Sequence, residues 1–276
     1  MLPGYGRKDS VTKGPGGYKV VPFSKVRLRI TDFLHLMHEK HVIHSLTELD
    51  VTEPREYIRQ HKAKTGESLS FTAFFIACLS KAVDEDKYMH AYRKWGNRLV
   101  LFDDVDVTTV VEHQVDEVRI ATPYIIRATN KKSFREIHRE IRASQQQKAR
   151  DFKKMPWYEN WFFSLPSAFR LVVFRLVGGS PGLRKRIEGT VAVTAAGMFG
   201  KGSAWGIPMT VYTLCLTLGG ISEKPGVVQG KIEAREYLSL TVSVDHDIVD
   251  GAPLARFMAR LKELVESGYG LAEPAG

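Results

Sequence analysis

The chain has 276 residues, 43% of them hydrophobic, and carries 40 Lys and Arg against 31 Asp and Glu, for a formal net charge of +9. A chain of this size and hydrophobic content can bury a sizeable core. No apolar run is long enough for a clean membrane span. The basic residues are spread along the whole sequence with no nucleic-acid motif beside them. Nucleic acid is therefore not expected as a partner, and an anionic small molecule would explain the charge equally well.

In chain order, hydrophobic periodicity predicts a helix from about 24, a strand at 42–52 and helices at 53–65 and 69–84. Strands at 98–112 and 118–128 and a helix at 133–150 follow. The C-terminal part predicts strands at 189–196, 208–220, 226–230 and 233–245, then a last helix from about 252 to 268. Strands joined both locally and through helices indicate an α/β (α+β two-layer) fold, a mixed sheet with helices on one face.

The start of the chain and its cysteines indicate the compartment. Residues 1–20 are polar, with glycines and lysines and no apolar core, which favours a flexible leader over a secretory signal. Residues 21–276 are predicted to form a single domain. Cys78 and Cys215 lie in apolar runs and are expected to be buried free thiols. This cysteine usage fits a cytoplasmic protein.

The segment around His246 is the most informative part of the sequence. Upstream, apolar and polar residues alternate from Leu238 to Asp245, which predicts a half-buried strand, and His246 keeps the parity of its inward face. Downstream, apolar residues at helical spacing predict an amphipathic helix, and Gly251 permits a sharp turn between the two. An inward-pointing imidazole at this place is either a core histidine bonded to a backbone carbonyl or a catalytic base.

A second group of histidines, at 35, 38, 41 and 44, recurs every three residues. This spacing superficially suggests a metal cluster. The run crosses from a predicted helix end into a strand, so the four rings should not converge, and no metal site is predicted.

His246, Asp250 and Gly251 form a His-x-x-x-Asp-Gly motif that resembles the catalytic signature of the dihydrolipoyl acyltransferases, the core components of 2-oxoacid dehydrogenase complexes, and of the related chloramphenicol acetyltransferases. Other segments are similar to the same family: 22–30, the Asp-Val-Thr at 50–52, the apolar helix at 70–83, and the strand and glycine turn at 190–200. The resemblance covers about residues 20–151 and 188–268. It implies a chloramphenicol acetyltransferase-like fold and an acyltransferase domain at 21–276.

The resemblance implies a role for each motif residue. His246 is the expected general base that takes a proton from an attacking thiol. Thr194, 52 residues earlier, is the expected hydroxyl donor to the oxyanion. Asp250 is expected to orient the loop through a buried pair with Arg27, although Arg27 as an exposed helix-surface charge is an equally good interpretation.

Residues along the substrate path depart from the family's pattern. His90 and Pro123 stand in segments that line this path in the relatives, and Gly197 stands in the glycine turn after Thr194. The residue after the family's catalytic histidine is basic in most relatives, whereas it is Asp247 here. If that carboxylate lies close to the ring, it should favour the imidazolium. Acyl and acceptor preferences are therefore expected to differ from those of the relatives.

The resemblance also implies ligands and assembly. Coenzyme A is expected as the acyl-CoA substrate, and the relatives build trimers with active sites between subunits, so a homotrimer is predicted. The sequence shows no lipoyl-lysine segment, and only about 20 residues precede the match, so neither a lipoyl domain nor a peripheral-subunit-binding domain is expected. The acyl group would then come from free acyl-CoA or from a lipoyl domain in trans.

An apparent insertion at about 152–187 is apolar and basic together. Its apolar residues are Trp157, Trp161, Phe162, Phe163, Phe169, Val172, Val173, Phe174, Leu176 and Val177, and its basic residues are Arg170, Arg175, Arg184, Lys185 and Arg186. The favoured interpretation is a subunit-contact or active-site-covering element, because so much aromatic surface should not stay exposed. A membrane-surface role is the less favoured alternative.

Three functions are compatible with these features. The favoured one is a coenzyme A dependent acyltransferase with a dihydrolipoyl or other small acceptor. The second is a chloramphenicol-type O-acetyltransferase, in which His246 would deprotonate a hydroxyl. The third is a trimeric scaffold that has lost acyl transfer, which Asp247 and the insertion motivate.

Overall fold

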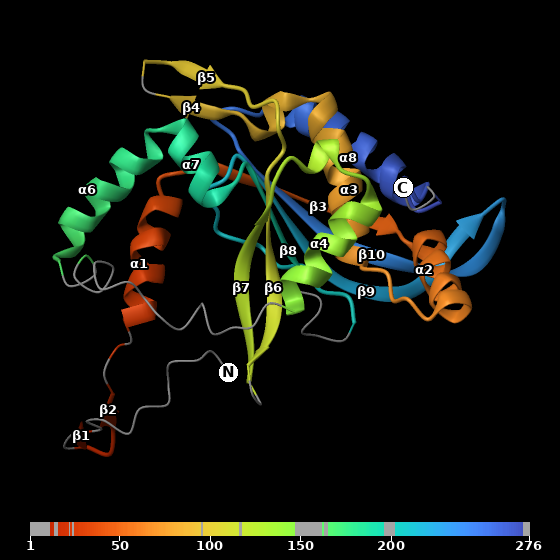
Figure 1. Ribbon diagram of the computed structural model, residues 1–276, viewed down its shortest axis with the longest axis horizontal. Helices are drawn as coiled ribbons and strands as arrows, with labels where there is room; N and C mark the ends of the chain where they lie inside the picture. The colour runs from red at the N-terminus through yellow and green to blue at the C-terminus, as the bar shows by residue number, and fades with distance from the viewer. Residues whose placement is uncertain are drawn as a thin grey trace.

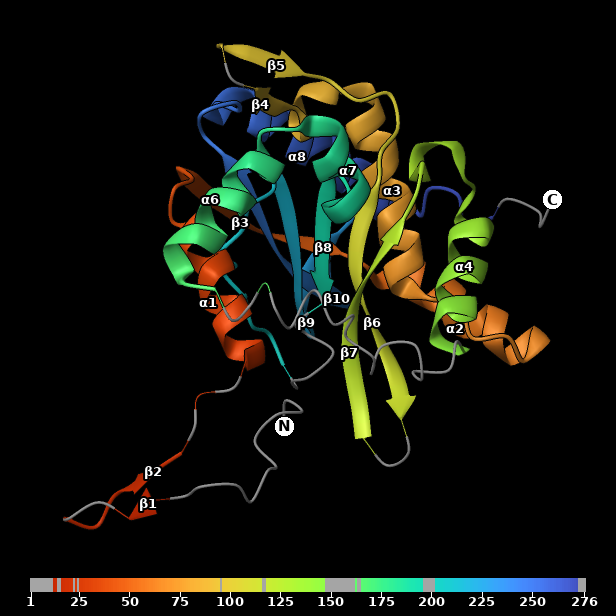
Figure 2. The ribbon, with the colours of Figure 1, turned by 60° about the vertical axis from the view of Figure 1, so that its left-hand side comes forward.

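The computed structural model describes residues 12–13, 16–21, 23, 25–94, 96–115, 118–146, 162, 165–195 and 202–272. Its centre is a six-stranded sheet with the order β3-β10-β9-β8-β6-β7. β8 pairs in parallel with β6 and β9, and the other pairs are antiparallel. The mixed sheet predicted from the sequence is thus confirmed, and Figures 1 and 2 show its helical cover.

The chain forms six strands of the central sheet, a set of helices and several short elements in the described residues. The strands of the sheet are β3 (Val42–Asp50), β6 (Val107–Val115), β7 (Val118–Ile126), β8 (Val191–Ala195), β9 (Leu214–Val228) and β10 (Lys231–Asp245). The helices are α1 (Lys25–Met37), α2 (Thr52–Thr65), α3 (Phe71–Glu85), α4 (Phe134–Gln146), α6 (Ser167–Gly178), α7 (Pro181–Glu188) and α8 (Gly251–Glu266). Short elements are β1 (Thr12–Lys13), β2 (Lys19–Val20), β4 (Tyr92–Lys94), β5 (Arg98–Val100), η1 (Lys87–His90) and η2 (Thr129–Lys131).

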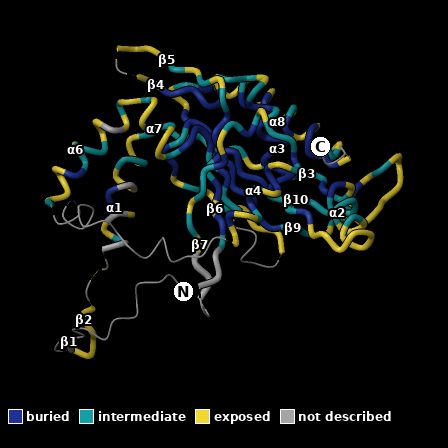
Figure 3. Tube along the Cα trace, viewed as in Figure 1, coloured by how far each residue is buried: buried dark blue, intermediate teal, exposed yellow. Residues whose placement is uncertain are grey.

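The main core lies between the sheet and the helices α3, α4 and α8. Helix α3 is apolar around most of its circumference, and ten of its fifteen residues are buried. In Figure 3 the buried stretches gather around the sheet and the helices that cover it. It begins at Ser70, whose side chain accepts a hydrogen bond from the Ala73 N–H at 3.2 Å. Phe74 and Phe75 are fully buried. Each such side chain contributes about 1.5–3 kcal/mol through removal of its surface from water.

The opposite face of the sheet is polar, and much of it is buried as well. Ser239, Thr241, Ser243 and Asp245 are all 1% exposed or less, so β10 is not the half-buried strand that its alternation predicts. Part of the cover comes from the segment 202–210. The Ser203 hydroxyl lies 2.9 Å from that of Ser239, and the Gly220 N–H donates to the Ala204 carbonyl at 3.0 Å.

Two glycines let this segment approach the sheet. Gly219 and Gly220 lie where the register between β9 and β10 shifts. A Cβ at Gly219 would come within 2.0 Å of the Ala204 carbonyl oxygen, and one at Gly220 within 1.8 Å of the Gly202 carbonyl oxygen. Any larger residue would push the covering segment off the strand. The bulge therefore accommodates a second layer of backbone on the polar face.

The structure differs from the predicted elements in three places. The predicted strand at 98–112 is divided into β5, which pairs with β4 in a hairpin, and β6. The predicted strands at 208–220 and 226–230 are one continuous strand, β9, which begins only at Leu214. Within the insertion, residues 167–188 form the helices α6 and α7.

Helices α1, α6 and α7 form a separate group at one end of the sheet (Figure 1). Arg170 of α6 and Asp32 of α1 form a bidentate ion pair, with nitrogen–oxygen distances of 2.7 and 3.0 Å. Both residues are at least 95% buried, so the pair fixes one helix on the other. The outer surface of α6 exposes Phe169, Val172 and Leu176. Among the described helices, none combines the length and the hydropathy that crossing a membrane requires.

Candidate active site

His246 lies in the turn that directly follows β10. The ladder of β10 with β3 ends at the pair Asp245 and Val42, so the alternation of the strand does not extend to residue 246. The sequence predicts an imidazole that points into the core. This prediction is wrong, because the side chain of His246 is 44% exposed in the single chain. The His246 N–H donates to the His41 carbonyl at 2.8 Å, which ties the turn to the start of β3.

Asp250 and Gly251 connect this turn to α8. Asp250 is the N-cap residue of α8, and its carboxylate lies 3.6 Å from His246 Nδ1 and is 83% exposed. This distance is too long for a hydrogen bond but close enough for an electrostatic contact with a protonated ring. Gly251 has no positive φ, and a Cβ there would meet nothing within 4 Å. The turn itself therefore does not require glycine, in contrast to the expectation from sequence.

Arg27 is distant from this turn along its helix. It lies in the first turn of α1, ten residues before Met37. At about 1.5 Å per residue, this places Arg27 about 15 Å from the helix end that leads to His41. Figure 1 shows α1 running away from the sheet toward the N-terminal segment. Because Asp250 is largely exposed and lies beside His246, the single chain does not form the buried pair of Arg27 and Asp250.

Thr194 lies on β8, on the face of the sheet opposite the main core. Its neighbours Val191 and Val193 are buried in that core, at 0% and 1% exposure. Thr194 shares one row of the sheet with Thr217 on β9 and Thr241 on β10. His246 follows Thr241 by five residues, about 17 Å at 3.3 Å per residue, and two strand spacings of about 4.8 Å separate the chains laterally. Within one chain, Thr194 and His246 are thus on the order of 20 Å apart.

The three residues expected along the substrate path have different environments. His90 is fully buried: its Nδ1 lies 3.1 Å from the Thr190 hydroxyl and its Nε2 lies 3.1 Å from the Phe102 carbonyl oxygen. Burial lowers the pKa of His90 to about 4, so this ring is a neutral core histidine. Pro123 is exposed on β7, the edge strand, which is where a sheet tolerates proline. Gly197 lies outside the described residues.

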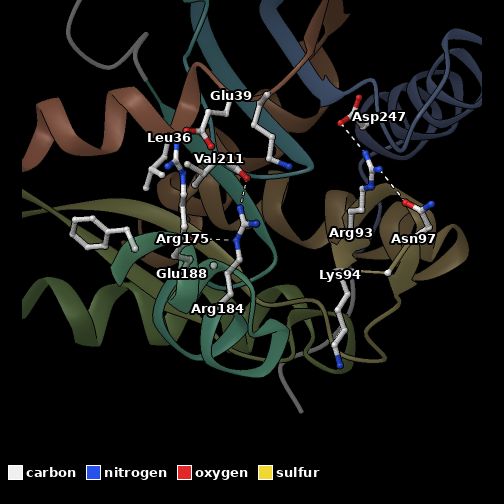
Figure 4. Close-up of a pocket in the computed structure, with 14 residues that line it drawn as sticks. Leu36, Glu39, Arg93, Lys94, Asn97, Arg175, Arg184, Glu188, Val211 and Asp247 are labelled. Atoms are coloured by element: carbon white, nitrogen blue, oxygen red, sulfur yellow. Dashed lines mark hydrogen bonds and ion pairs between the residues drawn. The ribbon is translucent and has the colours of Figure 1, made fainter. Parts of the chain in front are cut away.

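Asp247 binds groups other than the His246 ring. Its carboxylate lies 2.9 Å from His41 Nδ1 and 3.4 Å from Arg93 Nη1. The hydrogen bond with His41 is the main reason why the pKa of Asp247 is lower than usual. Figure 4 shows Arg93 of β4 between Asp247 and Asn97. The sequence gives no indication of these contacts.

A pocket of about 570 Å³ lies beside the His246 turn. Its walls come from the end of α1, the β4–β5 hairpin, α6, α7 and Asp247, and Figure 4 shows the lining side chains. Its cationic residues are Lys40, Arg93, Lys94, Arg175 and Arg184, and its acidic residues are Glu39, Glu188 and Asp247. Four of these cations form ion pairs with carboxylates: Lys40 with Asp245, Arg93 with Asp247, Arg175 with Glu39 and Arg184 with Glu188.

The histidine run at 35–44 does not gather in space around a metal. His44 Nδ1 lies 2.8 Å from the Ser243 hydroxyl, and His41 contacts Asp247. In the part of the chain that the structure describes, no group of three or more His, Cys, Asp or Glu side chains could hold a metal ion.

The mixed sheet with a helical layer on one face defines an α/β fold. The sequence matches the family model for the 2-oxoacid dehydrogenases acyltransferase (catalytic domain) over residues 15–156 and 183–272. The chain therefore belongs to this family of acyltransferases. The two matched stretches leave a gap that lies within the apparent insertion at about 152–187.

Curated relatives are components of 2-oxoacid dehydrogenase complexes. The chain is 26% identical over 268 residues to the lipoamide acyltransferase component of the branched-chain alpha-keto acid dehydrogenase complex of Bacillus subtilis (strain 168), covering 94% of this chain and 55% of the relative. It is 27% identical over 268 residues to the mitochondrial dihydrolipoyllysine-residue succinyltransferase component of the 2-oxoglutarate dehydrogenase complex of Saccharomyces cerevisiae, covering 94% and 50%. The chain thus spans about half the length of these relatives.

Solved structures show the same fold. A probable dihydrolipoamide acetyltransferase from Listeria monocytogenes has a TM-score of 0.69 at 21% identity, covering 94% of this chain and 99% of that chain. Azotobacter vinelandii dihydrolipoamide acetyltransferase has a TM-score of 0.68 at 19% identity, covering 94% and 95%; its catalytic mechanism was investigated at a serine, a histidine and an asparagine.

Proposed function

We propose that this protein transfers an acyl group between a coenzyme A thioester and a dihydrolipoyl group or another small acceptor. The observation that carries the proposal is the placement of His246. This residue lies on a turn with its imidazole 44% exposed and its Nδ1 facing the Asp250 carboxylate at 3.6 Å, in a chain of the acyltransferase family. A partly exposed imidazole beside a carboxylate is suited to general-base catalysis.

The chemistry assigns one role to each residue. His246 removes the proton from the acceptor thiol as its sulfur attacks the thioester carbonyl carbon. A thiol with a pKa of about 8.5 needs this help near neutral pH, which is typically worth about 10² to 10⁴ in rate. The Thr194 hydroxyl donates to the oxyanion of the tetrahedral intermediate. The intermediate collapses when the bond to the coenzyme A sulfur breaks, and the imidazolium returns the proton to that sulfur.

Spacing along the chain supports these roles. In the A. vinelandii enzyme, the serine named for the mechanism precedes the histidine by 52 residues, and the asparagine follows the histidine by four. Thr194 and Asp250 have the same separations from His246. We infer that Thr194 supplies the hydroxyl and that Asp250 orients the imidazole through Nδ1, which leaves Nε2 as the basic nitrogen.

The distance between His246 and Thr194 within one chain supports a site shared between subunits. A base and an oxyanion donor must both lie about 3 Å from the reacting group, whereas His246 and Thr194 of one chain are on the order of 20 Å apart. We therefore propose a homotrimer in which His246 of one subunit meets the partner subunit's Thr194. Exposed apolar side chains on the covering segment, Trp205, Ile207 and Met209, support such a contact.

Donor and acceptor identity can be tested with a panel of acyl-coenzyme A compounds against dihydrolipoamide, a free lipoyl domain, hydroxyl acceptors and amine acceptors. We expect transfer to the thiol acceptors and a loss of about 10² to 10⁴ in kcat for His246→Ala. Transfer only to hydroxyl acceptors would instead support the O-acetyltransferase. A folded trimer with no transfer from any donor would support the scaffold.

The shared site can be tested by subunit complementation. Co-expression of His246→Ala and Thr194→Ala chains with different affinity tags yields mixed trimers. In a trimer that contains both kinds of chain, one of the three interfaces combines an intact His246 with an intact Thr194 of the neighbouring subunit, so we expect about a third of the wild-type activity. Each variant alone serves as the inactive control. Mixed trimers that are as inactive as either variant would refute a site shared between subunits.

A further inference from the structure

Two adjacent residues, Lys40 and His41, contact each of three consecutive residues around His246. The Lys40 ammonium group forms an ion pair with the Asp245 carboxylate. The His41 carbonyl oxygen accepts the His246 N–H at 2.8 Å. The His41 ring then contacts Asp247 at 2.9 Å. Lys40 and His41 together therefore contact the residue before His246, His246 itself and the residue after it.

The contact of Lys40 with Asp245 involves a buried carboxylate. Asp245 is only 1% exposed, and a buried carboxylate needs a cation and hydrogen-bond donors nearby. Its Oδ2 pairs with Lys40, while its Oδ1 accepts the backbone N–H of Asp247 at 3.2 Å. One buried carboxylate thus connects Lys40 to the backbone on the far side of His246.

The contact with Asp247 lies at the surface and joins a third element. His41 is 78% exposed and Asp247 36% exposed, so this pair alone contributes little to stability. Arg93 approaches the same carboxylate from β4 (Figure 4). The turn is consequently fixed between the start of β3 and the β4–β5 hairpin.

We propose that Lys40 and His41 are positioning residues that aim the His246 imidazole at the substrate. This inference rests on the proposed function, in which His246 is the base. Both residues act through the backbone of residues 245–247, because they contact that backbone and the flanking carboxylates of Asp245 and Asp247. A displacement of about 1 Å in a catalytic group can cost on the order of 100-fold in rate.

The experiment compares disruptive and conservative variants at both positions. We expect Lys40→Met to lower kcat about 10-fold to 100-fold. His41→Ala should lower kcat by a smaller factor, because it keeps the backbone carbonyl that accepts the His246 N–H and removes only the surface contact with Asp247. Both variants should leave the KM for acyl-CoA unchanged. Lys40→Arg keeps the cation, and His41→Asn keeps a donor near the position of Nδ1, so both should restore most of kcat. His44→Ala is the matched control: it is a nearby histidine, but its ring contacts Ser243 and not the turn.

A second readout does not depend on catalysis. In protein with isotope-labelled histidine, the ring signals of His246 report its environment directly. We expect one sharp set in wild type, Lys40→Arg and His44→Ala, and shifted or multiple sets in Lys40→Met and His41→Ala. Because the His41 side chain is largely exposed, His41→Ala keeps the test valid if Lys40→Met does not fold.

The two proposals can fail separately. If wild type transfers no acyl group, the proposed function fails, while shifted His246 signals would still support the positioning role. If His246→Ala abolishes transfer but both disruptive variants keep wild-type kcat and unchanged His246 signals, the positioning role is refuted. A fall in kcat that the conservative variants do not restore would also count against it.

Discussion

The buried ring of His90 provides a quantitative test of the structure. Both ring nitrogens face polar partners, the Thr190 hydroxyl and the Phe102 carbonyl, and the side chain is fully buried. Burial lowers its pKa to about 4 from a reference value of 6.5. The folded protein therefore keeps this ring neutral at pH values where the unfolded chain protonates it.

The sign and size of the effect follow from linkage. Between about pH 6.5 and pH 4 the unfolded state binds more protons at His90 than the folded state does, so stability falls as the pH falls through this window. With pKa values of about 4 and 6.5, the contribution of His90 at pH 5 is about 2 kcal/mol smaller than at pH 7.5. Above pH 7.5 both states leave the His90 ring neutral, so this residue no longer changes the free energy of unfolding with pH.

The assay is urea unfolding of wild type and His90→Gln at fixed protein concentration between pH 8.5 and pH 5. We expect the wild type to lose about 2 kcal/mol more than the variant from pH 7.5 to pH 5, and the two curves to run parallel above pH 7.5. An NMR titration of the His90 ring should show its midpoint near pH 4. A midpoint above pH 6, or equal losses in both proteins, would refute a buried neutral His90.

Three further outcomes test the packing. Arg170→Met should lower the free energy of unfolding by about 3–5 kcal/mol, because it leaves the buried Asp32 carboxylate without its partner. A double variant that also carries Asp32→Asn should recover part of this loss. A loss below about 1 kcal/mol in the single variant would contradict the buried pair. Cys78 and Cys215 should react with a thiol reagent only after unfolding, because burial raises the pKa of both thiols; rapid labelling of the native protein would show that this burial is incorrect. Ser70→Ala should cost about 1 kcal/mol through loss of the α3 N-cap, and calorimetry that detects no change would exclude the cap.

Local patterns predict the elements well where one face of an element is strongly apolar. The helices Phe71–Glu85 and Gly251–Glu266 lie close to their predicted positions because their spacing of apolar residues sets the period. The pattern predicts two strands, 208–220 and 226–230, where the structure has the single strand Leu214–Val228. Three glycines and a proline interrupt its pattern, yet pairing with β10 holds the whole length in one ladder.

The arrangement around His246 could not be predicted in the same way. The pair of Lys40 and Asp245 joins residues 205 positions apart, and the hydrogen bond of His41 with Asp247 joins residues 206 apart. No periodicity contains such information. The motif at 246–251 identifies the histidine, but the end of the strand at Asp245 decides that the ring leaves the core, and this end depends on the length of its partner β3.

The two faces of the sheet explain why a site of this kind would need more than one chain. The helical face is closed by the protein's own core, so no substrate can reach a strand residue from that side. Thr194 points to the other face, where the described cover is an extended segment that leaves Trp205, Ile207 and Met209 partly exposed. His246 lies beyond the strand end on the order of 20 Å away. A second copy placed against this face would cover the apolar side chains and could bring its own His246 to Thr194, so burial and catalysis would favour the same assembly.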